Sequence, residues 1–129
     1  MDFLSSNSML MLEKSMGFLW TKQAAISDNI ANAETPNYKT KVVTFEESLR
    51  SRLKQAAGQE AGARGAVRRV LEQSEFAVTE PQESTRMDDN GVDTTEQMIE
   101  LVRNAYQQQY VYQAINKSYS ILRMAVRGQ

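Results

Sequence analysis

The chain has 129 residues, of which 41% are hydrophobic and 24% are charged, values that fit one ordinary globular domain. Its 15 basic and 16 acidic residues leave no positive excess for holding a phosphate backbone, so we expect no nucleic acid partner. Histidine and cysteine are absent, which removes the usual metal ligands, the thiol nucleophile and the commonest general base. We therefore expect no enzymatic activity, no small-molecule substrate, no cofactor and no metal site.

The N-terminal residues do not predict a cleaved secretory signal. No basic segment opens the chain, and polar residues interrupt the apolar ones. If the protein leaves the cytoplasm, we expect it to use another route.

The first predicted helix runs from about Met9 to about Ala33. Its apolar residues recur at 3,4 spacing, the heptad period that keeps one seam of a helix facing a partner. A second apolar row lies on another side of this helix, which is more than a two-helix pair covers. Pro36 ends the helix near Glu34, because the residue before a proline avoids the helical region. The predicted seam consists of Met9, Leu12, Met16, Leu19, Gln23, Ile26, Ile30 and Ala33.

Residues 42–56 predict a short extended start followed by a short helix. Phe45, Leu49 and Leu53 recur there every four residues, as on one face of a helix.

The remainder of the middle segment is interpreted as a connector. The glycine-rich residues 57–66 predict a flexible loop, and we expect the part from Gly58 to Gly65 to be mobile. Residues 67–78 predict a short strand or hairpin arm. Residues 87–91 are dense in turn formers.

The second long helix begins at a capping signal. In Asp93-Thr94-Thr95-Glu96 we expect Asp93 to accept a hydrogen bond from the third helical amide and Glu96 to reach back. The helix runs to about Val126, and Gly128 ends it. Its predicted seam consists of Met98, Leu101, Ala105, Gln108, Tyr112, Ile115, Tyr119, Leu122 and Val126.

These elements predict a mainly α fold, with long N- and C-terminal helices that pair as an α-helical coiled coil. The loop-rich middle segment holds a short helix and a short β-hairpin or strand. We expect an N-terminal helix in residues 1–33, a connector in 34–92 and a C-terminal helix in 93–129, with the two ends forming one structural domain.

Each seam has one polar member, Gln23 and Gln108, and a lone polar seam residue can fix the register of two helices. If the helices run antiparallel with these two residues matched, Met9 lies near Leu122. Both helices carry more apolar surface than one hairpin buries, so we expect the chain to complete its core in an assembly with copies of itself.

The end of the first helix resembles a motif shared by bacterial flagellar rod and hook proteins, N-I-A-N-x-x-T-P-x-Y. The match covers about fourteen residues, from Ile26 to Lys39. Asparagine side chains suit backbone hydrogen bonding where a helix unwinds, and proline sets the exit direction. The motif residues are Asn29, Ile30, Ala31, Asn32, Thr35, Pro36 and Tyr38.

A second segment, residues 86–93, is similar to the R-x-D-G-N-x-V-D segment that precedes the C-terminal helix in proximal rod proteins of this family. The family's glycine is Asp89 here, and a glycine stands at position 91 instead. Downstream, Asn104 and residues 106–114 are similar to the family's N-x-x-x-Y-Q-A region.

The resemblance implies a structural subunit of the basal-body rod, the periplasmic drive shaft that transmits torque from the motor to hook and filament. Such proteins have no enzymatic activity and leave the cytoplasm through the flagellar type III export apparatus without a cleaved signal. Expected partners are copies of the chain, other flagellar rod proteins and the adaptor protein at the membrane ring.

The resemblance also marks Phe45 and Leu49 as a candidate export-gate recognition element. The alternative is an amphipathic turn that packs both side chains. For the whole chain, two other functions stay open: a cytoplasmic coiled-coil adaptor or secretion chaperone, and an enzyme that works with carboxylates alone.

Overall fold

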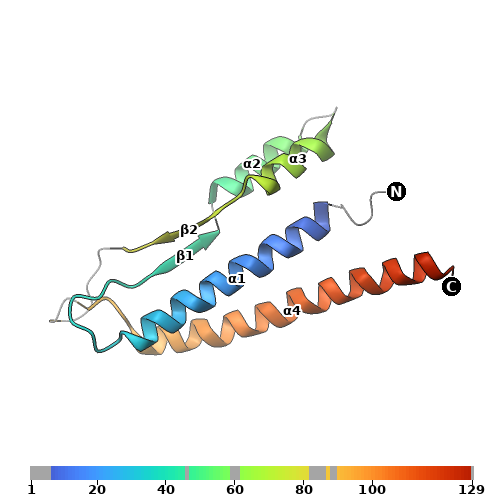
Figure 1. The fold of residues 1–129 in the computed structure, drawn as a ribbon. Helices are drawn as coiled ribbons and strands as arrows, with labels where there is room; N and C mark the ends of the chain where they lie inside the picture. Colours follow the sequence, from blue (N-terminus) through green and yellow to red (C-terminus); the bar gives the residue numbers. More distant parts are fainter. Residues whose placement is uncertain (1–6, 46, 59–61, 82–86, 88–89, 129) are drawn as a thin grey trace.

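The computed structural model describes residues 7–45, 47–58, 62–81, 87 and 90–128, and it is mainly helical (Figure 1). Six elements follow one another along the chain. They are α1 (Asn7–Ala31), β1 (Val42–Phe45), α2 (Glu47–Ala57), α3 (Ala63–Glu72), β2 (Phe76–Thr79) and α4 (Thr94–Arg127).

Helix α1 lies in the middle of the molecule, between α4 on one side and the remaining elements on the other (Figure 1). Helices α1 and α4 run antiparallel. We call the region where they meet, residues 29–41 and 90–97, the elbow. The opposite end, where α1 begins and α4 ends, is called the free end. Strands β1 and β2 and the α2–α3 pair extend from the elbow towards the free end along α1.

The prediction of two long terminal helices is confirmed. Helix α1 begins and ends two residues earlier than expected. After Ala31 the chain continues in turns, in which the amide of Ala33 donates to Ile30 O and that of Thr35 donates to Asn32 O.

Helix α4 is capped at both ends. Asp93 Oδ1 accepts from the amides of Thr95 and Glu96, at 2.9 and 3.2 Å, which satisfies donors that have no partner inside the helix. At the other end Gly128 takes the left-handed conformation with φ 69°, and its amide donates to Met124 O. Glycine adopts this conformation without steric cost, so the helix ends here.

The predicted short helix and strands of the middle segment are also confirmed. Helix α2 follows β1 directly, and β1 pairs antiparallel with β2 in a two-stranded sheet. The register runs from Val42 opposite Thr79 to Phe45 opposite Phe76. The two strands are 30 residues apart in sequence, and the α2–α3 pair occupies the connection between them.

Two expectations about this connection were wrong. Within the expected loop 57–66, helix α3 begins at Ala63, and within the expected strand 67–78 it continues to Glu72, so only Phe76–Thr79 is extended. Residues 59–61 lie outside the described part of the chain. The reason is tertiary: Leu71 is buried, with Val67 and Val70 half-buried beside it, and α3 packs against both α2 and α1. Gly62, with φ 86°, makes the left-handed turn that starts α3.

The core is a narrow band along α1. Its buried apolar residues are Leu19, Ala25 and Ile26 from α1, Ala33 and Val92 from the elbow, Val43 from β1, Ala56 from α2 and Leu71 from α3. Lys14 ties α1 to the end of α3, because its Nζ donates to Ser74 O at 3.2 Å.

The part of the chain that the structure describes offers neither a membrane span nor a metal site. No helix there combines the length and the apolar character needed to cross a bilayer. Within the same ranges, no three acidic, histidine or cysteine side chains gather in a way that could hold a metal ion.

Candidate assembly interface

Asn29 is the centre of the elbow and is completely buried. Its Nδ2 donates to Lys41 O at 2.8 Å and to Gln97 Oε1 at 3.0 Å. Its Oδ1 accepts from the amide of Lys41 at 2.8 Å and from the hydroxyl of Tyr38 at 3.3 Å. One side chain thus joins the end of α1, the residue before β1 and the first turn of α4. Because both its donors and its acceptor are used, no other residue type reproduces this set of bonds.

Asn90 fastens the elbow from the other side and is also completely buried. Its Nδ2 lies 3.1 Å from Asn32 O, 3.0 Å from Ala33 O and 2.8 Å from Thr35 O. Its Oδ1 accepts from the amide of Val92 at 2.7 Å. These carbonyls follow the end of α1, where no helical amide is available to them. Asn90 therefore acts as a C-terminal cap supplied from almost 60 residues away.

The other motif residues shape the turn between α1 and β1. Asn32 Nδ2 donates to Asp28 O at 2.8 Å, and the hydroxyl of Thr35 donates to Asn32 Oδ1 at 3.2 Å. Asn37 has φ 59°, a left-handed conformation that asparagine tolerates better than most residues. Ile30 is half-buried, whereas Ala31 and Pro36 are exposed.

Tyr38 links the two sequence motifs through its backbone and its side chain. Its carbonyl accepts from the amide of Gly91 at 3.0 Å, while its hydroxyl points to Asn29. Burial raises the pKa of the Tyr38 phenol, because the neutral form is favoured away from water.

Polar layers continue along the α1–α4 interface from the elbow. Lys22 Nζ forms an ion pair with Glu100 Oε2 at 2.7 Å, and Glu100 also pairs with Arg103. The next layer places Asn104 Nδ2 3.1 Å from Leu19 O. Asn104 Oδ1 is buried and has no hydrogen-bond partner among the described residues.

The third layer is the pair of glutamines. Gln108 Nε2 donates to Gln23 Oε1, as expected for antiparallel helices with these two residues matched. Beyond it the interface becomes apolar, and Met9 and Leu122 line the same cavity near the free end. Specific polar bonds therefore fix the register in the half near the elbow, and apolar contacts complete the other half.

The Glu100 ion pair gives a pH-dependent prediction. The hydrogen bond from Lys22 lowers the Glu100 pKa below 4.5, more strongly than burial raises it, and the charges of Lys22 and Arg103 lower it further. A depressed folded pKa means that stability is fully present above the unfolded value and is lost as the pH falls through the folded value. Glu100→Gln should therefore reduce the loss of stability between about pH 5 and about pH 3 by roughly 1 kcal/mol or less.

Urea unfolding of the wild type and Glu100→Gln at several pH values tests this expectation. The matched control is Glu96→Gln, one turn earlier on α4, where the carboxyl is exposed. Equal pH profiles for wild type and Glu100→Gln would contradict the assigned role of the ion pair.

The structure places the predicted seam of α1 against its neighbours. Leu19, Ile26 and Ala33 are buried, and Gln23 is exposed at the edge although it bonds to Gln108. The other predicted members, which are half-buried, are Met9, Leu12, Met16 and Ile30.

The predicted seam of α4 differs from the observed one. Leu101, Gln108, Ile115 and Leu122 do face inwards. The other members, Met98, Ala105, Tyr112, Tyr119 and Val126, are exposed. Their places are taken by the preceding residue in four cases, namely Gln97, Asn104, Val111 and Ser118. The helix is thus rotated, because Gln97 and Asn104 bond to α1 and draw these polar positions inwards.

Several of these residues were missed by reasoning from the sequence. Gln97, Asn104, Val111 and Ser118 also recur every seven residues, but three of them are polar, so apolar periodicity favours the row beside them. For Asn90 the sequence predicts only a turn. Its position in residues 86–93, the second segment that resembles the rod family, was a signal that Asn90 has a role beyond the turn.

The candidate export-gate element is described only in part. Phe45 ends β1 and Leu49 lies in α2, but their side chains lie outside the described part of the structure. The element stays a prediction.

Two comparisons with known proteins agree with this geometry. Residues 20–39, which run from the middle of α1 through the turn after Asn29, match the family described as "Flagella basal body rod protein". The matched segment is therefore similar to one class of protein, the flagellar basal-body rod proteins.

Over its whole length the chain is similar to one particular member of that class. It is 28% identical over 133 residues to the flagellar basal body rod protein FlgB of Bacillus subtilis (strain 168), with 97% of each chain covered. Together the two comparisons support a FlgB-like rod protein. Both the family and the relative are structural rod proteins, not enzymes.

Proposed function

We propose that the chain is a structural subunit of the proximal part of the bacterial flagellar rod. It self-assembles through α1 and α4 into the periplasmic shaft that transmits torque from the motor to hook and filament. The similarity to FlgB over 97% of both chains is the observation that carries this proposal. In it, residues 1–33 and 93–129 form the assembling unit, and residues 34–92 form the connector between them.

The elbow supports this role, because it gives the helix pair one fixed geometry. Its two buried asparagines come from the two segments that resemble the rod family. Asn29 of the first segment bonds to Gln97 of α4, and Asn90 of the second segment bonds to the carbonyls of Asn32 and Ala33. A subunit that passes torque needs helices that do not slide along each other. Hydrogen bonds in the half near the elbow oppose such sliding, because a shift of one helix along the other would break them.

The surface of α4 supports assembly. Helix α4 packs mainly against α1, and its outer side exposes apolar and aromatic side chains along most of its length. An exposed apolar surface of this extent is typical of a protein interaction site. Its tyrosines suit interfaces that stay partly wet, because each combines a broad apolar ring with a polar tip.

The proposed partners follow from the same role. They are copies of the chain, other flagellar rod proteins, the adaptor protein at the membrane ring and the flagellar type III export apparatus. We propose export through that apparatus without a cleaved signal peptide.

Deletion of the gene in its native host tests the function. We expect non-motile cells whose basal bodies lack a complete rod, and restored motility when the gene is returned. We also expect the chain in purified basal bodies and, in cells unable to build a hook, in the culture medium. A deletion strain that swims with complete basal bodies would refute the proposal.

Limited trypsin digestion gives a second prediction at the level of the molecule. Lys117, Arg123 and Arg127 are exposed on the last part of α4, where the chain lacks the polar layers of the elbow. We expect rapid cleavage at these sites in the free subunit and protection in assembled rods. Equal cleavage rates in both states would contradict burial of α4 on assembly, and Arg52 of α2 serves as an internal reference site.

A further inference from the structure

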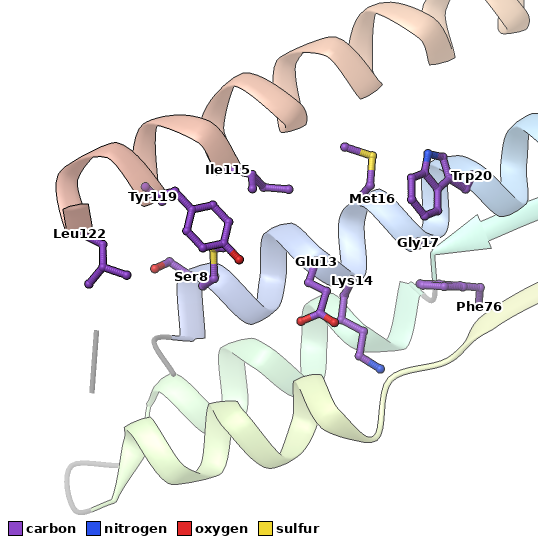
Figure 2. Close-up of a pocket in the computed structure, with 12 residues that line it drawn as sticks. Ser8, Glu13, Lys14, Met16, Gly17, Trp20, Phe76, Ile115, Tyr119 and Leu122 are labelled. Carbon is purple, nitrogen blue, oxygen red and sulfur yellow. The ribbon is translucent and has the colours of Figure 1, made fainter. Parts of the chain in front are cut away.

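A groove of about 720 Å³ opens along α1 near the free end. Helix α1 forms its floor, α4 forms one wall, and β2 contributes to the other through Phe76 (Figure 2). Its apolar lining includes Met9, Met16, Trp20, Phe76, Ile115 and Leu122. Trp20 is 65% exposed at the groove although it is the chain's single tryptophan and one of its largest apolar side chains.

An apolar ridge lies at the other end of the molecule, on the first half of α4. It consists of Met98, Ile99, Val102 and Tyr106, which are 49, 55, 57 and 71% exposed. These residues share one side of the helix over about 12 Å at ~1.5 Å per residue. A helix presenting such residues at 3,4 spacing is the form of partner that an apolar groove between helices accepts.

Charge also distinguishes the end with the ridge from the end with the groove. On α4 both acidic residues, Glu96 and Glu100, belong to the first two turns beside the ridge, and Asp93 caps that end. Arg103, which pairs with Glu100, is the basic residue of α4 in this region. The basic residues Lys117, Arg123 and Arg127 lie on the half that borders the groove, and no acidic residue follows Glu100 in the chain. Counted along α4 and its cap, negative charge is in excess beside the ridge, and only positive charge lies beside the groove. Such complementarity favours contact between unlike ends and disfavours contact between like ends.

We propose that the groove of one copy binds the ridge of a second copy of this chain. The proposal rests on the self-assembly in the proposed function and specifies the surfaces that carry it. Because the ridge and the groove lie at opposite ends, the contact is heterologous: each bound copy still presents a free ridge or a free groove. Such a contact propagates into an open chain of subunits instead of closing as a symmetric dimer.

Two blocked variants test the contact. Ile99→Glu with Val102→Glu blocks the ridge and leaves the groove intact. Ser118→Arg with Trp20→Phe fills the groove, leaves the ridge intact and removes the tryptophan signal of that protein. Ile99, Val102 and Trp20 are exposed and Ser118 is half-buried, so circular dichroism melts should show that both variants fold. Gln109→Glu with Gln113→Glu is the matched control on exposed positions of α4.

Sedimentation velocity measures the outcome. We expect the wild type and the control to associate progressively with concentration, and each blocked variant alone to associate about tenfold or more weakly. An equimolar mixture of the two blocked variants should form a dimer and stop there, because only one groove and one ridge remain. Trp20 of the ridge-blocked variant should shift its emission to the blue in this mixture. Raising the NaCl concentration should weaken the dimer, since exposed charges are screened.

The results separate the inference from the proposed function. A wild type that associates while both blocked variants associate equally well would overturn the ridge-and-groove contact and leave self-assembly standing. A wild type that stops at a dimer would also overturn it, because a heterologous contact continues. A wild type that remains monomeric at every concentration would overturn both.

Discussion

Replacing Asn29 by alanine should destabilise the fold by about 3 kcal/mol or more, the largest effect that we expect from a single substitution at the elbow. Asn29 is completely buried and makes four hydrogen bonds. Its removal leaves the amide and the carbonyl of Lys41 and the Gln97 amide oxygen without this partner. Each buried group that loses its partner costs about 1–3 kcal/mol, although a water molecule that enters the space would reduce the sum.

Thermal and urea unfolding followed by circular dichroism measure this effect. A decrease in melting temperature of roughly 10 °C corresponds to the expected loss. The matched control is Asn116→Ala, the same change at an exposed position of α4, which should stay within about 0.5 kcal/mol of the wild type. Asn29→Asp is a second variant: it keeps the shape but cannot donate to Lys41 O or Gln97 Oε1. Equal stability of the Asn29 variants and the control would contradict the central role of Asn29.

Replacing Asn90 by alanine should destabilise the fold by about 2 kcal/mol and should loosen the end of α1 in particular. The three carbonyls after α1 lose the Asn90 amide, while Asn32 O and Thr35 O keep the backbone amides of Thr35 and Tyr38. The amide of Val92 loses its acceptor. We therefore expect the substitution to accelerate amide hydrogen exchange, relative to the wild type, more in residues 28–38 than in the middle of α4. The local measurement matters, because a general loss of stability would accelerate exchange in both segments together.

Asn37→Ala is a useful comparison for Asn90→Ala. It alters the same turn but removes no bond to Asn90, and it costs stability only because alanine tolerates φ 59° less well. Unchanged exchange in residues 28–38 of Asn90→Ala would show that the cap is dispensable.

Local signals made much of the fold predictable from sequence. The Asp93 cap, the Gly128 stop and the 3,4 spacing of both terminal helices act within a few residues. The observed ends of both helices lie within two residues of the predicted ends. The short strand and helix after Val42 also follow from local patterns. In such segments the preferences of neighbouring residues agree with the final structure.

Tertiary contacts decided what could not be predicted. The glycines at 62 and 65 favour a loop by composition, yet α3 forms because burial of Leu71 outweighs the weak helix propensity around it. The rotation of α4 has a similar cause. Apolar periodicity favours Met98 and Ala105 at the interface, whereas the hydrogen bonds of Gln97 and Asn104 to α1 depend on residues more than 60 positions away.

The elbow motif was recognisable, but its bonding was not. The asparagines at 29 and 32 suggested local bonds where the helix unwinds, which holds for Asn32 and its bond to Asp28 O. Asn29 instead reaches Gln97, and Asn90 reaches the end of α1, across 68 and up to 58 residues of sequence. Sequence spacing alone carries no information about such partners.

The antiparallel path of α1 and α4 has a mechanical consequence. A pull applied to the two ends of the chain would separate α1 from α4, beginning at the free end. Their contacts would break one after another, and the polar layers near the elbow would break last. A twisting load applied along the outer sides of both helices would instead strain all of the layers at once. The same bonds that yield in sequence to peeling would share a shearing load, so the hairpin is most resistant when neighbours hold it along its sides.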